Sequence, residues 1–149
     1  MIIEKSINIE RPVDVVFAFV ADPRNDTIWC PKVKSVEPVP GSPGEGPGAR
    51  FAVVHRPVPF LAPKQMDYSL VDWEPGRKIE WFEDDGHDRI AVTYTLEPDG
   101  GSTRLTQRDD AELAAPKILH PLMRIGIGAD ISGQLKRLRK HLEQTSETA

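Results

Sequence analysis

The last quarter of the chain carries an apolar stripe with the spacing of an α-helix. Its intervals are four, three and four residues, through Ile131, Leu135, Leu138 and Leu142. Lysine and arginine fill the other faces of this segment, which suits the C-terminal end of a helix. The pattern predicts a helix from about 117 to 144, and at ~1.5 Å per residue such a helix is roughly 40 Å long.

The middle of the chain alternates between apolar and polar residues, which is typical of strands with one buried face. Turn signals separate the alternating segments, among them Glu74-Pro75-Gly76, Asp84-Asp85-Gly86 and Asp99-Gly100-Gly101. Two short helical segments, 13–20 and 25–29, follow the first strand. The predicted strands cover about 1–10, 33–39, 51–55, 66–74, 79–81, 92–96 and 103–111.

A helix of this length must lie across a broad surface, and the concave face of a curved antiparallel sheet is the only candidate in this chain. We therefore expect an α+β fold in which a seven-stranded curved antiparallel sheet wraps around a long C-terminal helix. The 149 residues fit one domain, with a structured part of about 1–145. This geometry leaves a hollow between helix and sheet, and function is expected there.

Composition and charge narrow the possible functions. The single Cys30 rules out an internal disulfide, and Glu4 and Lys5 interrupt the first apolar run, so no secretion signal is expected. No apolar stretch approaches the ~20 residues that a membrane span needs. The net charge is −4 and the basic residues gather on the last helix, which makes nucleic acid an unexpected partner. We expect a cytoplasmic protein.

Several short motifs occur in an order that is similar to a known superfamily. They are Ile9-x-x-Pro12-x-x-Val15-x-Phe17, Asp22-Pro23, Trp29-x-Pro31, Gly48-Ala49-Arg50-Phe51, Leu70-x-x-x-Glu74-Pro75-Gly76-Arg77, Gly101-Ser102-Thr103-Arg104-Leu105 and Leu135-Lys136-Arg137-Leu138. This order resembles the START-related helix-grip superfamily (SRPBCC), in particular its polyketide cyclase/dehydratase-like branch. The resemblance covers nearly the whole chain. It implies a helix-grip fold whose internal cavity holds a hydrophobic small molecule, such as a polyketide, an aromatic compound or a lipid.

Strand alternation and the helix stripe together predict which residues line this cavity. Hairpin alternation also places the connections 57–63 and 84–88 at the same end as the segment 112–120, where we expect the mouth. Phe60, in the proline-bounded loop 57–63, is expected to act as a lip over the mouth. The predicted ligand-binding residues are Trp29, Phe51, Val53, His55, Phe60, Met66, Tyr68, Trp81, Val92, Tyr94, Gln107, Met123 and Ile127.

Some polar residues share the face that is expected to point inward. They are Lys5, His55, Gln107 and Asp109. Burying an unpaired charge costs several kcal/mol, so three interpretations stand. The groups lie in water at strand ends, they form a polar anchor at the floor of the pocket, or the register slips by one residue. The resemblance puts the first strand beside the last, so Asp109 is expected to pair with Lys5 or through Gln107.

The chain lacks a glycine-rich phosphate loop, a nucleophile elbow and a Cys/His metal spacing. We therefore expect no cofactor and no metal. Binding or carriage of a hydrophobic small molecule is the leading hypothesis. The first alternative is an aromatase/cyclase or dehydratase acting on a poly-β-ketone, and the second is a protein-interaction module without a ligand. The catalytic candidates for the enzyme are Lys5, His55, Tyr94 and Asp109. The sequence leaves the oligomeric state open.

Three glycines interrupt the first half of the predicted long helix. Each costs about 1 kcal/mol relative to alanine in a helix interior. Gly126, Gly128 and Gly133 therefore predict a bend or a close approach, with the glycines facing the hollow beside Met123 and Ile127. An interrupted helix is the alternative.

Overall fold

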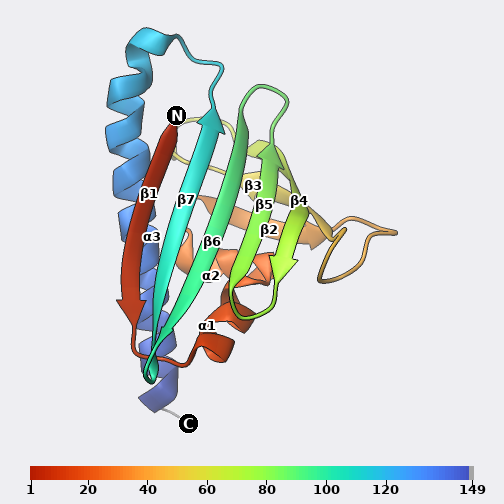
Figure 1. Ribbon diagram of the computed structural model, residues 1–149. Coiled ribbons are helices and arrows are strands. Elements are labelled where there is room, and N and C mark those ends of the chain that lie inside the picture. Colours follow the sequence, from red (N-terminus) through yellow and green to blue (C-terminus); the bar gives the residue numbers. More distant parts are fainter. Residues whose placement is uncertain (148–149) are drawn as a thin grey trace.

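The computed structural model describes residues 1–147, with side chains through 145, and contains one seven-stranded sheet with all helices on one of its faces (Figure 1). Every neighbouring pair of strands is antiparallel, and the order is β1-β7-β6-β5-β4-β3-β2. The predicted α+β architecture is confirmed. The elements are β1 (Ile2–Ile9), α1 (Val13–Val20), η1 (Pro23–Asn25), α2 (Asp26–Trp29), β2 (Val33–Pro38), β3 (Arg50–His55), β4 (Lys64–Glu74), β5 (Lys78–Asp84), β6 (Arg89–Asp99), β7 (Ser102–Glu112), η2 (Lys117–Leu119) and α3 (His120–Glu147).

The strands follow the alternation in the sequence. Burial alternates residue by residue along β7, and the same holds for β3 and most of β5. A tight turn at Gly100, with φ +62°, joins β6 to β7, and glycine adopts this left-handed conformation without steric cost. A register shift between Leu70 and Asp72 interrupts the β4–β5 ladder, and such bulges bend and twist a strand. The sheet therefore has a concave inner face.

Helix α3 is continuous over 28 residues. It begins three residues after the predicted start, because a short 3₁₀ turn occupies 117–119. Pro121 lies in its first turn, where a missing N–H has no consequence. The predicted leucine stripe is buried to within a few per cent and packs on the inner face of the sheet.

The glycines of α3 do not all face the interior. A Cβ on Gly126 would meet nothing within 4 Å, whereas one on Gly128 would lie 3.5 Å from Cε of Lys5. Gly128 therefore lies at a contact between α3 and β1, in line with the predicted close approach, and the alternative of an interrupted helix is wrong because α3 is continuous. Gly126 lies on an open surface.

The three segments predicted at the mouth do meet at one end of the sheet. The backbone N–H of Ala114 donates to Oδ1 of Asp88 at 2.8 Å. Nζ of Lys64 lies 3.9 Å from Oδ2 of Asp85, which joins the start of β4 to the β5–β6 connection. Within residues 1–147, no helix has both the length and the apolar character to cross a bilayer.

Candidate functional site

Most of the predicted lining residues are packed in the interior between the sheet and the helices. Their aromatic rings pack edge to face, with centroids 5.9 Å apart for Phe51 and Trp81 and 6.1 Å apart for Trp29 and Tyr94. Met123 and Ile127 on α3 are half-buried. The buried members of the predicted set are Trp29, Phe51, Val53, His55, Met66, Tyr68, Trp81, Val92, Tyr94 and Gln107.

Phe60 is the member of the predicted set that lies outside this interior. Its side chain is 83% exposed, and that of Leu61 beside it is 56% exposed. Neither residue plugs the core. The prolines around them hold the loop 57–63 at the mouth with its apolar side chains pointing into solvent.

Lys5 also lies outside the interior. Its backbone is paired with Gln107, as its position in the alternation requires, but its side chain is exposed. β1 is an edge strand, so a long side chain can leave the sheet past α3 and keep its ammonium group hydrated. No ion pair joins Lys5 to Asp109 among the described residues. The expected Lys5–Asp109 pair is therefore wrong.

Asp109 is held through Gln107 instead, which was the other expectation. Nε2 of Gln107 donates to Oδ1 of Asp109 at 3.0 Å, and both side chains are buried. Burial raises the pKa of Asp109, while the bond from Gln107 and the charge of Lys32 lower it. The inward polar groups on β7 thus form a bonded pair.

His55 and Tyr68 form a second pair on the opposite part of the sheet. Nε2 of His55 and Oη of Tyr68 are 2.6 Å apart and buried. Burial lowers the pKa of His55 to about 4, and the nearby Lys32 lowers it further, so the imidazole is neutral at pH 7. Burial also raises the pKa of Tyr68, which keeps its hydroxyl protonated.

Two buried carboxyl groups were missed by the sequence reasoning. Glu83 on β5 is 9% exposed and Asp26 on α2 is 8% exposed. Burial raises the pKa of Glu83 to about 7, against the lowering effect of Lys32. Burial raises the pKa of Asp26 well above its usual range, and the neighbouring Glu83 raises it further. Glu83 has the same strand parity as Ile79 and Trp81, so the alternation could have identified it.

Two buried polar atoms have no hydrogen-bond partner among the described residues. They are Nε1 of Trp29, a donor, and Oε1 of Gln107, an acceptor. Tyr94 is a neighbour of both residues, because its ring packs against Trp29 and its Cα lies opposite Gln107 in the sheet. The Trp29 side chain lowers the pKa of Asp26, but its N–H meets no acceptor in hydrogen-bond geometry. Oε1 of Gln107 therefore has unfilled hydrogen-bonding capacity, whereas the N–H of Trp29 is partly satisfied by the carboxyl group of Asp26.

Two hollows lead toward this interior from opposite sides. One, of about 290 Å³, lies at the predicted mouth, where Lys32 and Pro57 face Gly133 and Gln134 of α3. The other, of about 240 Å³, lies between α1 and the β2–β3 connection. It reaches two predicted lining residues, Phe51 and Trp81. Gln134 is buried, so the first hollow ends against the core.

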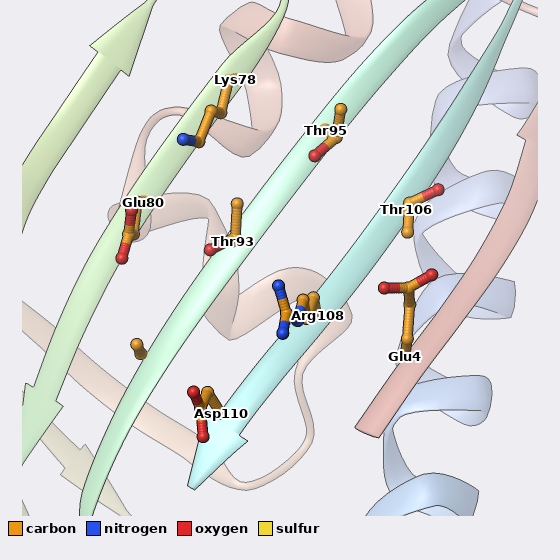
Figure 2. A pocket seen from close by; sticks show the side chains of 9 residues that line it. Glu4, Lys78, Glu80, Thr93, Thr95, Thr106, Arg108 and Asp110 are labelled. Carbon is orange, nitrogen blue, oxygen red and sulfur yellow. The ribbon is translucent and has the colours of Figure 1, made fainter. Parts of the chain in front are cut away.

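A third hollow, of about 400 Å³, lies on the outer face of the sheet (Figure 2). Its lining mixes both charge signs with threonines: Glu4, Lys78, Glu80, Thr93, Thr95, Thr106, Arg108 and Asp110. This is the composition of a hydrated sheet face. In the described part of the chain, no three His, Cys, Asp or Glu side chains come together as a metal site would require.

The fold and this enclosed, mostly aromatic interior define a START-like helix-grip protein. Similar solved structures are a protein of Thermus thermophilus, TTHA0849, and a START superfamily protein from Mycobacterium smegmatis. They share 20% and 15% identity with this chain, at TM-scores of 0.79 and 0.78. The alignments cover 98% and 97% of this chain and 99% and 98% of those proteins.

The Zhui aromatase/cyclase from Streptomyces sp. R1128 is also similar, with 15% identity and a TM-score of 0.74. That alignment covers 97% of this chain and 94% of the aromatase/cyclase. No curated protein matches the sequence. The model of the family "Polyketide cyclase / dehydrase and lipid transport" matches residues 1–143, and the chain belongs to this family.

Proposed function

We propose that the chain binds a mostly apolar small molecule that carries a hydroxyl group, in the space between the sheet and the helices. The observation that carries this proposal is the pair of buried atoms without partners, Nε1 of Trp29 and Oε1 of Gln107. A buried donor or acceptor without a partner costs about 1–3 kcal/mol. A ligand hydroxyl group can accept from the indole or donate to the amide, and so satisfy one of these atoms.

The apolar part of such a ligand would be held by the aromatic side chains. Trp29, Tyr94 and Trp81 are each at most 7% exposed, and ligand sites of this kind combine an apolar lining with a few polar groups that fix orientation. The neutral His55–Tyr68 pair adds hydrogen-bonding groups without a charge. An aromatic or polyketide-like molecule fits this chemistry better than a plain hydrocarbon.

Two matched probes, 2-naphthol and naphthalene, test the proposal. We expect 2-naphthol to bind about tenfold more tightly or better, since one satisfied buried hydrogen-bonding group is worth about 1 kcal/mol or more. Gln107→Leu should reduce this preference and leave naphthalene binding nearly unchanged. Thr106→Val, on the outer face of the same strand, is the control.

Equal affinities for the two probes, or no binding of either, would overturn the proposal. Native mass spectrometry of the purified protein gives an independent reading. It should detect a co-purifying molecule with one or more oxygen atoms.

A catalytic role is the second candidate, because several groups that can exchange protons lie in the same interior. Glu83, with a pKa of about 7, lies opposite Tyr68 in the β4–β5 pair. A carboxyl group with this pKa can serve as a general acid near neutral pH. The reaction would be an aromatase/cyclase or dehydratase step on a poly-β-ketone.

Incubation with a linear poly-β-ketone, followed by mass spectrometry of the products, tests this candidate. The enzyme should form a cyclised or dehydrated product faster than buffer, and the rate should fall as the pH rises through about 7, where Glu83 loses its proton. Glu83→Gln should remove the pH dependence and most of the rate. A product distribution equal to that of buffer would reject catalysis.

A further inference from the structure

Exposed apolar side chains gather in two segments of the chain. Ten large hydrophobic residues are exposed in the described part, and six of these lie in the loop 57–63 or between 118 and 125. Exposed apolar patches of this kind mark interaction sites. We call these six residues the apolar rim: Phe60 (83% exposed), Leu61 (56%), Ile118 (85%), Leu119 (46%), Leu122 (70%) and Ile125 (70%).

The helical part of the rim is a second apolar stripe. Ile118, Leu122 and Ile125 are separated by four and three residues, so they lie on one side of the helical segment. Ile127 and Ile131 point the other way and pack on the core. A helix that only covers a sheet needs one apolar stripe. The outward stripe therefore serves a different purpose.

Both segments of the rim lie at the mouth of the interior. Pro57, at the start of the loop, shares a hollow with Ala129 and Asp130 of α3. Figure 1 shows the N-terminal turns of α3 at the end of the sheet where β1 begins. The two parts of the rim therefore lie at the same end of the sheet, although they are far apart in the sequence.

The two segments that contain the rim carry charges of a single sign, although Glu112 and Asp130 border the second segment. The segments 56–64 and 113–129 contain no aspartate or glutamate, although the chain has 23 acidic residues. They contain Arg56, Lys64, Lys117 and Arg124. The rim is therefore apolar and cationic on a protein whose net charge is −4.

Two acidic residues of the neighbouring β5–β6 connection make contacts near the rim. Asp88 accepts a hydrogen bond from the backbone of Ala114. Asp85 accepts from the backbone N–H groups of His87 and Asp88 and lies 3.9 Å from Nζ of Lys64. The pair with Lys64 offsets the charge of Asp85, and Arg56, Lys117 and Arg124 form no ion pair among the described residues.

We propose that the apolar rim docks onto an anionic lipid surface. Apolar side chains at a helix face and a loop tip, flanked by lysine and arginine, are the features of proteins that insert shallowly among lipid headgroups. The rim residues protrude rather than line a groove, which suits a fluid surface more than a rigid partner. A twofold dimer through the rim would bring the cationic segments of two copies together, and like charges disfavour such a dimer.

Docking at this place would turn the mouth of the interior toward the lipid. An apolar ligand could then pass between bilayer and protein without crossing water. This last consequence rests on the proposed function, whereas the docking itself does not.

Sedimentation with lipid vesicles tests the docking. The protein should bind vesicles of phosphatidylcholine mixed equally with phosphatidylglycerol, bind pure phosphatidylcholine more weakly, and lose affinity as salt is raised. The double substitution Leu122→Ser with Ile125→Ser should weaken binding at least ~10-fold, because two inserted side chains are lost. Lys117→Gln should weaken binding to the anionic vesicles about fivefold.

The control is Ile28→Ser with Val71→Ser, which removes two exposed apolar residues, 49% and 57% exposed, outside the rim. Phe60→Trp adds an exposed reporter, whose emission should shift to shorter wavelength when anionic vesicles are added. An equal loss of binding in the control, equal binding to both vesicle types, or no sedimentation would overturn the proposal. A concentration-dependent dimer that only the rim variant abolishes would overturn it in favour of a second copy.

The rim variant also separates this proposal from the ligand proposal. Its residues are exposed, so 2-naphthol should bind the rim variant as it binds the wild type in the absence of vesicles. Loss of vesicle binding with intact 2-naphthol binding supports docking. Loss of both in a folded protein contradicts it.

Discussion

Acidic residues occur on both faces of the sheet, but they are buried on the inner face and exposed to a hollow on the outer face. Asp109 and Asp110 are neighbours in β7, but the first is 7% exposed on the inner face and the second lines the hollow on the outer face (Figure 2). Glu83 and Glu80 show the same contrast on β5, because Glu83 is buried and Glu80 borders the outer hollow. Strand alternation therefore determines which carboxyl groups acquire unusual chemistry.

The largest expected difference between the faces is in packing. Leu105 is fully buried and Thr106, next to it, shares an exposed hydrogen bond of 2.8 Å with Ser6. Leu105→Ala should lower the free energy of unfolding by about 2–5 kcal/mol, through lost burial and a residual cavity. Thr106→Ala should cost about 0.5 kcal/mol or less. Urea denaturation of both variants measures the difference, and equal losses would show that the inner face is poorly packed.

The next difference between the faces concerns how the stability of the protein depends on pH. Burial raises the pKa of Glu83 from about 4.5 to about 7, so the folded state binds this proton more tightly than the unfolded state. The contribution of Glu83 to stability is thus complete below pH 4.5 and is lost as the pH rises to 7. Glu83→Gln should therefore stabilise the protein relative to wild type at pH 8, by on the order of 2–3 kcal/mol.

Titration of His55 changes the stability in the opposite direction over an overlapping pH range. Burial lowers its pKa from 6.5 to about 4, so stability is lost as the pH falls through that interval. The wild-type curve contains both effects, so the informative quantity is the difference between Glu83→Gln and wild type at each pH. Glu80→Gln, on the outer face of the same strand, is the matched control for the change from Glu to Gln. A flat difference for Glu83→Gln would contradict the buried carboxyl.

A smaller effect is expected at the Gln107–Asp109 pair. Asp109→Ala removes the acceptor of the Gln107 side-chain amide and leaves that buried donor without a partner, at a cost of about 1–3 kcal/mol. Asp109→Asn keeps an oxygen acceptor and should cost less than about 1 kcal/mol. The exposed Lys5 loses no partner in either variant, so the larger penalty for stranding an ammonium group should not occur. Chemical denaturation at pH 7 distinguishes the two substitutions.

Much of the fold could be predicted from the sequence, because the helical and strand periodicities of apolar residues identify its main elements. The leucine stripe identified α3, and alternation placed Phe51, Val53 and Trp81 on the inner face, where they are buried. Alternation specifies the direction in which a side chain leaves the backbone, but not whether a neighbouring element covers it. Lys5 shows the limit, since it has inward parity on an edge strand and still reaches solvent.

The buried acids could not be identified with the same ease. Asp26 lies in a helix of four residues, which is too short to show any periodicity. Glu83 precedes the acidic turn at 84–86, whose composition suggests full hydration. Its burial depends on the contact of β5 with elements distant in sequence. The unpaired atoms of Trp29 and Gln107 likewise depend on packing that no local pattern encodes.

The last prediction concerns Cys30, which reports whether the inner face is closed to solvent. Its side chain is 5% exposed. Burial, together with the neighbouring Asp26, raises the pKa of its thiol. Because the thiolate is the reactive form, Cys30 should react with a disulfide reagent only as fast as the protein opens. A cysteine on the outer face, Val71→Cys in a Cys30→Ser background, should react at the rate of a free thiol. If Cys30 reacts as fast as that reference, water reaches the interior freely, and the carboxyl groups there would lose the burial that raises their pKa.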